Sequence, residues 1–189
     1  MSTTNIMIVG VGGQGTLLAS RILGNAVIRQ GHDVKVSEVH GMSQRGGSVV
    51  TYVKYGEAVH SPVIDKGEAD IILAFELLEA YRALPWLKKG GKMIVNDQKI
   101  NPMPVITGAA KYPENILEKL QKEVDVTALD ALNLAKEAGN AKAANVVLIG
   151  VMAKNTSIPY EEWIETVRTS VPPKFVDVNL KAFELGYNL

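Results

Sequence analysis

The chain has 189 residues and a formal net charge of zero, with 47% hydrophobic and 21% charged residues. This length and composition suit one α/β domain, expected to span residues 1–189, and exclude a disordered chain because a sizeable apolar core can be buried. The basic residues are scattered along the sequence. We therefore expect neither nucleic acid nor an anionic membrane surface as a partner, since both require a positive stripe.

The chain contains no cysteine. This absence excludes disulfides, thiol nucleophiles, zinc–thiolate sites and cysteine-ligated iron–sulfur clusters from the chain itself. Residues 1–10 lack the basic segment and the apolar run of a signal peptide, and no apolar stretch approaches the roughly 20 residues that a membrane-spanning helix needs. We expect a cytoplasmic protein without a membrane anchor.

The first predicted elements are a buried apolar strand at residues 6–9 and a helix at residues 14–30. Leu18, Ile22 and Ala26 repeat along one face of this helix. The remaining predicted strands are short apolar, β-branched or aromatic runs, at residues 34–39, 48–55, 58–61, 71–75, 92–95, 105–106 and 124–127. The remaining predicted helices are at residues 77–86, 113–122, 129–138, 143–154, 160–170 and 176–185.

The connection between the second and third predicted strands is too short for a parallel crossover. Only residues 40–47 separate these strands, whereas a parallel crossover needs about a dozen residues or more, so we expect antiparallel neighbours. The predicted fold is a three-layer α/β fold with a Rossmann-like mixed sheet, mostly parallel with an antiparallel hairpin section. Gly150, inside a predicted helix, indicates close helix packing or a subunit contact.

Residues 10–15, GVGGQG, lie between the first strand and the first helix. Gly10, Gly12 and Gly15 match the G-x-G-x-x-G spacing of dinucleotide-binding proteins, in which glycines let the backbone approach a phosphate. The alternative is a tight turn that needs glycine only for close packing. A nicotinamide dinucleotide also requires an acid after the second strand; Glu38 stands 23 residues after Gly15, although an exposed strand residue is the simpler interpretation.

Residues 40–48, HGMSQRGGS, form a second glycine-rich segment. It would leave the same sheet edge as residues 10–15 if the first two strands run parallel, and ligands bind at that edge in open α/β sheets. Arg45 would supply a permanent positive charge for a phosphate or carboxylate. The neutral hydrogen-bonding residues around it are Ser43, Gln44 and Ser48. The alternative is a solvated surface loop in which Gly46 and Gly47 serve a turn.

Glu76 and Asn96 follow apolar strands and would line the same crevice if those strands are parallel to the first. Each is also typical of a helix start or a turn. His40 lies at this edge, but the three histidines show no metal-ligand spacing. No motif for a nucleophile, a zinc site or a phosphate-binding lysine is present. The sequence therefore predicts neither a metal site nor a catalytic residue on this chain.

With these segments in place, the sequence resembles the gamma-type subunits and domains of 2-oxoacid:ferredoxin oxidoreductases, and within them the indolepyruvate branch. GVGGQGTLLASRILG at residues 10–24 matches the first signature of the family, and SEVHGMSQRGGSVVTYVKYG at residues 37–56 matches the second. Three shorter segments fit in order, SPVI, DIILAFELLEA and NVVLIG. The pair of glycine-rich segments makes the resemblance specific, and it extends over essentially the whole chain.

The resemblance implies a hetero-oligomeric enzyme that oxidatively decarboxylates aryl pyruvates, indolepyruvate first among them, to aryl-acetyl-CoA and CO₂ with ferredoxin as acceptor. A larger partner subunit would carry thiamine diphosphate and the iron–sulfur clusters, and ferredoxin would be reached through the complex. No cofactor is expected on this chain alone, and it would be inactive by itself.

The resemblance further implies that this chain contributes to the coenzyme A side of the site. The binding residues carried over are Gly10, Gly12, Gly13, Gln14, Gly15, Ser43, Gln44, Arg45, Gly46 and Gly47. Two alternatives stay open. One is a free-standing NAD(P)-binding oxidoreductase that uses Glu38, and the other is a purely structural subunit.

Overall fold

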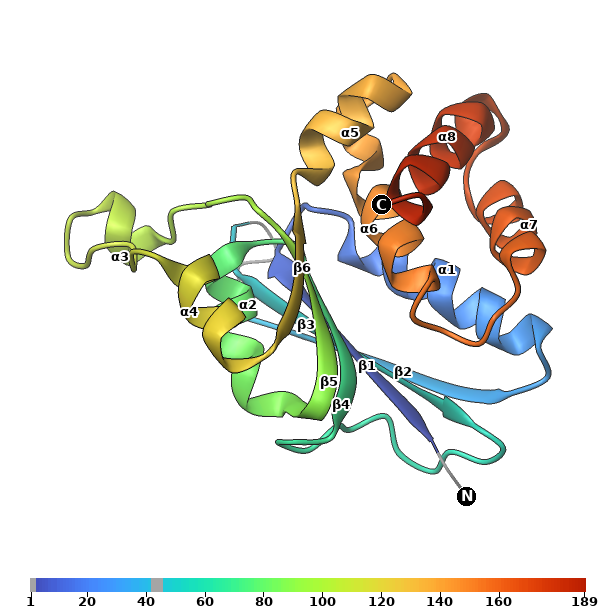
Figure 1. Ribbon diagram of the computed structural model, residues 1–189, viewed down its shortest axis with the longest axis horizontal. Helices are drawn as coiled ribbons and strands as arrows, with labels where there is room; N and C mark the ends of the chain where they lie inside the picture. The colour runs from blue at the N-terminus through green and yellow to red at the C-terminus, as the bar shows by residue number, and fades with distance from the viewer. Residues whose placement is uncertain (1–2, 42–45) are drawn as a thin grey trace.

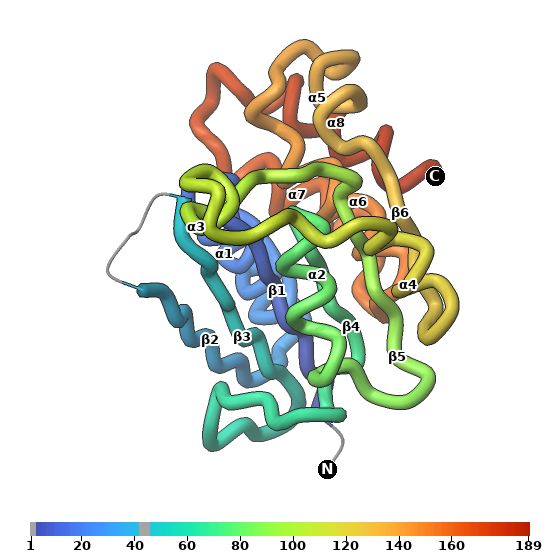
Figure 2. Tube along the Cα trace, turned by 90° about the vertical axis from the view of Figure 1, so that its left-hand side faces the viewer, coloured from blue at the N-terminus to red at the C-terminus, as the bar shows by residue number. Residues whose placement is uncertain are grey.

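A six-stranded sheet forms the centre of the computed structural model, which describes residues 3–41 and 46–189. The strand order is β2-β3-β1-β4-β5-β6, and Figure 2 shows the first five strands in this order across the sheet. The strands are β1 (Thr4–Val11), β2 (Asp33–His40), β3 (Ser48–Gly56), β4 (Ala69–Ala74), β5 (Leu87–Asn96) and β6 (Asp125–Leu129).

The sheet is mixed, as predicted. β4 pairs in parallel with β1 and β5, and β5 pairs in parallel with β6. β3 is antiparallel to both β1 and β2, so β2 runs in the same direction as β1. The antiparallel pairing of β3 with β2 and β1, beside the parallel run β1-β4-β5-β6, confirms the predicted fold class.

Helices cover both faces of the sheet and make three layers (Figure 1). The helices on one face are α1 (Thr16–Arg29), α5 (Ala131–Ala138), α6 (Ala144–Ala153), α7 (Tyr160–Ser170) and α8 (Val176–Tyr187). The other side holds α2 (Leu77–Ala83), α3 (Met103–Ile106) and α4 (Ile116–Glu123). Three 3₁₀ turns lie at Leu84–Trp86, Ala141–Ala143 and Pro173–Phe175. No helix in the described part of the chain is long and apolar enough to cross a membrane.

Alternation along β1 divides the buried core into two clusters. Ile6 and Ile8 pack into the cluster on the α1 face, whereas Met7 and Val9 pack into the cluster on the α2 face. Successive side chains of a strand point to opposite faces, so a strand covered on both sides is apolar throughout. The run of residues 6–9 that sequence periodicity assigned to a buried strand therefore lies at the centre of the molecule.

Two predicted strands are wrong. Residues 58–61 form no strand, because the Val59 amide donates to the Asp33 carboxylate at 2.8 Å and Pro62 follows closely. Residues 105–106 belong to the short helix α3, where the Val105 and Ile106 amides both donate to the Pro102 carbonyl at 2.9 and 3.1 Å. In both places, local capping of the amides replaces pairing with a neighbouring strand.

α6 and α8 cross at two glycines. A Cβ atom on Gly150 would lie 2.2 Å from the Phe183 carbonyl oxygen, and one on Gly186 would lie 2.0 Å from the Val147 carbonyl oxygen. Neither distance is possible without moving a helix backbone. Close helix packing at Gly150, expected from the sequence, is confirmed, and it fixes α6 against the C-terminal helix.

Gly150→Ala should therefore lower the free energy of unfolding by about 1–3 kcal/mol, because the added methyl group forces α6 and α8 apart. Chemical denaturation monitored by circular dichroism measures this change.

Gly24→Ala is the matched control, since its Cβ would meet Val36 at an ordinary 3.9 Å within α1. Alanine there should be neutral or stabilising by about 0.5–1 kcal/mol. Equal effects of the two substitutions would contradict the packing argument.

Candidate ligand-binding site

The carboxyl ends of β1, β2, β4 and β5 lie at one edge of the sheet, because these strands share one direction. The loop after β1 and the segment after β2 therefore leave the same edge, as the sequence analysis required. Gly12 donates its amide to the Gly47 carbonyl at 2.8 Å, and Gly46 donates to the Gly12 carbonyl at 3.2 Å. The two glycine-rich segments are thus joined directly at Gly12.

The predicted binding residues Ser43, Gln44 and Arg45 lie outside the described residues. The glycines of the two glycine-rich segments are described. Two in the loop after β1 and one before β3 adopt the left-handed region that glycine favours. Their φ angles are 103° at Gly13, 88° at Gly15 and 75° at Gly46.

Two glycines of the first loop are required by packing. Gly10 lies in β1, where a Cβ atom would approach both Gln14 Oε1 and Phe75 Cβ to 2.9 Å. A Cβ atom on Gly15 would lie 2.7 Å from Asn145 Nδ2. The packing explanation of these glycines, left open by the sequence, therefore applies at both positions, and their binding role stays a prediction.

Gln14 ties the loop to the ends of the neighbouring strands. Its Oε1 accepts from the Val11 amide at 2.7 Å, and its Nε2 donates to the Phe75 carbonyl at 2.9 Å and to Gln98 Oε1 at 3.1 Å. Both polar atoms of the carboxamide are thereby used within the protein. Gln14 was predicted as a binding residue, and the structure places it where it positions the loop.

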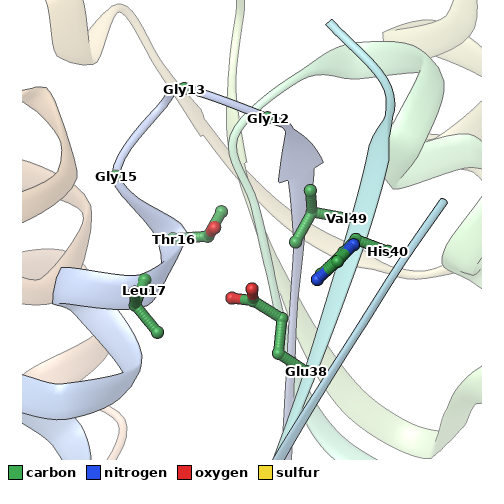
Figure 3. A pocket seen from close by; sticks show the side chains of 8 residues that line it. All are labelled: Gly12, Gly13, Gly15, Thr16, Leu17, Glu38, His40 and Val49. Carbon is green, nitrogen blue, oxygen red and sulfur yellow. The ribbon is translucent and has the colours of Figure 1, made fainter. Parts of the chain in front are cut away.

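A cavity of about 490 Å³ opens on one side of the glycine loop. Glu38 and His40 point into it from β2, opposite Thr16 and Leu17 in the first turn of α1 (Figure 3). The Thr51 hydroxyl donates to the Glu38 carboxylate at 3.4 Å. We name this space the α1 cavity; its other lining residues are Gly12, Gly13, Gly15 and Val49.

The sheet order weakens the dinucleotide interpretation of Glu38. In a Rossmann domain the acidic residue follows the strand next to β1. Here β3 occupies that place, and β2 lies one strand further out. Glu38 is therefore displaced from the position in which it would contact the ribose of a nucleotide bound across the β1 loop.

A second cavity of about 540 Å³ opens on the opposite side of the same loop, toward α5 and α6. We name it the α6 cavity. Its lining residues are Gly13, Gln14, Gly15, Phe75, Asn96, Gln98, Leu132, Ala141, Lys142, Ala144 and Leu148. Gln98 and Lys142 were not predicted from the sequence. For Gln98, the only signal in the sequence was its position two residues after Asn96. For Lys142 the sequence carried no signal.

Glu76 caps α2 and anchors the chain that returns past it. Its carboxylate is 1% exposed and accepts from the Glu79 amide at 2.9 Å, the Ile100 amide at 3.1 Å and the Tyr112 hydroxyl. Burial, followed by the hydrogen bond to Glu76, raises the pKa of Tyr112 above its usual value. The helix-start interpretation of Glu76 is confirmed.

Asn96 has a similar role at the end of β5. Its Nδ2 donates to the Phe75 carbonyl and to Gln98 Oε1, each at 3.1 Å, and its Oδ1 accepts from the Ala131 amide at 3.0 Å. The side chain is 3% exposed. Asn96 lines the α6 cavity, as expected for a crevice residue, while its polar atoms hold β5, the Phe75 carbonyl and the start of α5 together.

Comparison with known proteins gives a consistent result. The model of the family described as "Pyruvate ferredoxin/flavodoxin oxidoreductase" matches residues 5–189. "Indolepyruvate oxidoreductase subunit IorB" of Thermococcus kodakarensis is 49% identical over 194 residues, which cover 98% of this chain and 95% of the relative.

Two solved structures share the fold. The gamma subunit of a keto/oxoacid ferredoxin oxidoreductase from Geobacter sulfurreducens superposes with a TM-score of 0.73 and 28% identity, over 98% of this chain and 96% of the other. A 2-oxoglutarate:ferredoxin oxidoreductase from Magnetococcus marinus, with 2-oxoglutarate, coenzyme A and succinyl-CoA bound, superposes with a TM-score of 0.73 and 18% identity. The match covers this whole chain and 31% of the longer one.

Gln14→Glu tests the anchor of the glycine loop. The introduced carboxylate cannot donate to the Phe75 carbonyl or to Gln98, so we expect a loss of about 2–4 kcal/mol in the free energy of unfolding at pH 7. Its folded-state pKa would be raised, so the loss should be smallest below the unfolded glutamate pKa of about 4.3 and grow as the pH rises. Denaturation at several pH values measures both effects. The exposed Gln121→Glu in α4 is the control, and an equally small effect of both substitutions would contradict the anchoring role.

Tyr112→Phe tests the Glu76 anchor. Removing the hydroxyl leaves a buried carboxylate with one donor fewer, so the free energy of unfolding at pH 8 should fall by about 1–2 kcal/mol. Because the folded-state pKa of Tyr112 is raised, its contribution is complete below the unfolded pKa of about 10 and is lost as the pH rises through the folded value. The advantage of the wild type should therefore shrink above about pH 10. Tyr81→Phe, at a 38% exposed residue, should have no such effect.

Proposed function

The chain belongs to the pyruvate ferredoxin/flavodoxin oxidoreductase family, and we propose that it is the smaller subunit of a thiamine-diphosphate-dependent aryl-pyruvate:ferredoxin oxidoreductase. Indolepyruvate is the proposed 2-oxo acid, because the similar protein of Thermococcus kodakarensis carries that name and is 49% identical over nearly its full length. The products would be aryl-acetyl-CoA and CO₂, with ferredoxin as electron acceptor.

One observation carries the role of this chain in that reaction. The two glycine-rich segments are joined at Gly12, where the amide donates to Gly47 and the carbonyl accepts from Gly46. Residues 10–15 and the described glycines Gly46 and Gly47 thereby form one wall at the carboxyl edge of the sheet, where open α/β folds bind ligands. We propose that this wall holds coenzyme A and that residues 1–189 act as one domain in doing so.

The redox cofactors do not fit this chain. A chain without cysteine has no thiolate to ligate an iron–sulfur cluster, and residues 3–41 and 46–189 bring no three His, Asp or Glu side chains together as a metal site. We assign thiamine diphosphate, the clusters and the contact with ferredoxin to a larger partner subunit in a cytoplasmic hetero-oligomer. This chain contributes binding and assembly, and no catalytic residue.

Two rival functions make different demands. A free-standing NAD(P)-dependent enzyme would need an acid beside β1, and the placement of β3 between β1 and β2 disfavours it. A purely structural subunit would need no free ligand-binding space at the loop, and the cavities on both sides of it favour a binding role. Calorimetric titration of the isolated chain with NAD(H) and NADP(H) tests the first rival, because tight binding would support an NAD(P)-dependent enzyme.

The test is the purified complex of this chain with the larger subunit, assayed for indolepyruvate-dependent ferredoxin reduction. Arg45→Ala should raise the KM for coenzyme A about tenfold or more and leave the KM for indolepyruvate unchanged, because a charge-assisted contact to phosphate is lost. Arg21→Ala, at an exposed position of α1, is the control.

Three results would contradict the proposal. The first is full activity of the larger subunit without this chain, and the second is pyridine-nucleotide oxidoreduction by this chain alone. The third is a KM for coenzyme A that Arg45→Ala and Gly12→Val both leave unchanged in the assembled complex.

A further inference from the structure

We propose that the α6 cavity, and not the α1 cavity, receives the phosphate-bearing part of coenzyme A, with Lys142 as the cationic contact and Gln98 as a donor to its amide or phosphate oxygens. This inference rests on the proposed function and deepens it. It adds two residues that neither glycine-rich segment contains, and it assigns the two sides of the glycine loop different roles.

Topology favours this side of the loop. β1 and β4 are parallel neighbours, but the chain leaves β1 toward α1 on one face of the sheet and leaves β4 toward α2 on the other (Figure 1). Ligands in open α/β sheets bind in the crevice outside the strand ends where the connections diverge in this way. Phe75 directly follows β4 and lines the α6 cavity but not the α1 cavity, whereas Gly13 in the loop after β1 lines both.

The charges of the two cavities point the same way. Lys142 is the charged residue among those that line the α6 cavity, and the described residues place no carboxylate within ion-pair distance of it. Glu38 is the corresponding charge among the described lining residues of the α1 cavity. Of these two described charges, Lys142 attracts a phosphate and Glu38 repels it, so together they favour the α6 side for an anionic ligand.

Gln98 is oriented by a chain of hydrogen bonds that begins at two backbone amides. The Val11 amide can only donate, so it fixes the oxygen of Gln14, and the Ala131 amide fixes the oxygen of Asn96 in the same way. The nitrogens of both carboxamides then donate to Gln98, at 3.1 Å each, so the atom of Gln98 that meets them is its Oε1.

The Nε2 of Gln98 is consequently left as a donor with no hydrogen-bond partner in residues 3–41 and 46–189. A carbonyl or phosphate oxygen of a ligand would satisfy its N–H groups. Leu132 and Leu148 add apolar lining, and a volume of about 540 Å³ lies in the range of small-molecule sites. A cation, an amide donor and apolar walls fit a ligand that joins phosphate groups to an amide-containing chain, and coenzyme A has this chemistry.

The experiment compares coenzyme A with pantetheine, which has the amides but no phosphate, in the purified complex. Lys142→Gln should raise the KM for coenzyme A about tenfold or more and leave the binding of pantetheine, measured as competitive inhibition, unchanged. Lys142→Glu should raise the KM for coenzyme A further, and Lys142→Arg should keep this KM near the wild-type value. Lys136→Gln, at an exposed position of α5 outside the cavity, is the matched control and should have no effect.

The outcomes separate the two proposals. If Lys142→Gln leaves the KM for coenzyme A unchanged while Arg45→Ala raises it, the proposed function stands and the assignment of the α6 cavity is wrong. If Lys142→Gln weakens coenzyme A and pantetheine equally, or if Lys142→Arg does not restore binding, the effect is structural and the phosphate assignment is again wrong. If none of these variants changes the KM for coenzyme A, both proposals fail.

Discussion

The carboxamide of Gln14 holds the candidate site together. It bonds the Val11 amide at the end of β1, the Phe75 carbonyl after β4 and the Gln98 side chain after β5. Three separate strand ends therefore depend on one side chain, whose oxygen and nitrogen have to point in opposite directions. Gly10 follows from this constraint, because any Cβ atom there would meet the carboxamide oxygen. The glycine loop owes its shape first to an internal hydrogen-bond network, and a ligand would meet a wall that is already formed.

The antiparallel strand β3 is the second determinant of the site. Its insertion between β1 and β2 widens the sheet by one strand on the α1 side, and brings the segment before β3 back to Gly12. Gly46 and Gly47, which precede β3, therefore lie beside the loop after β1. In a Rossmann domain the strand next to β1 carries the acidic residue at this edge. The same insertion leaves β2 at the sheet edge, with Glu38 and His40 facing the first turn of α1.

Sequence reasoning predicted the features that follow from local pattern and connection length. The buried strand β1, the helix after it, the antiparallel pair at β2 and β3 and the close contact at Gly150 all belong to this class. It could not find the α6 cavity, because Gln98 and Lys142 are far apart in the sequence and carry no motif, and only the fold brings them together. It assigned Gln14 to ligand binding, which stays a prediction, and it did not show the anchoring role, because a motif specifies a residue type without showing which way the side chain points. The two wrong strands, at residues 58–61 and 105–106, have the composition of strands but find their amide partners in Asp33 and Pro102.

The described residues on the two sides of the loop differ in charge, and under the proposed function this difference would let the chain contribute to an enzyme through binding alone. Lys142 on the α6 side and Glu38 on the α1 side would orient an asymmetric ligand bound at the loop before any reaction takes place. Orientation of this kind contributes to catalysis by lowering the entropic cost of bringing two reactants together. A subunit that supplies only position needs neither cysteine nor a perturbed acid or base at the loop. It does need an anchored loop. Gln14 supplies that anchor directly, and Asn96 supports it by bonding the same Phe75 carbonyl and Gln98 side chain.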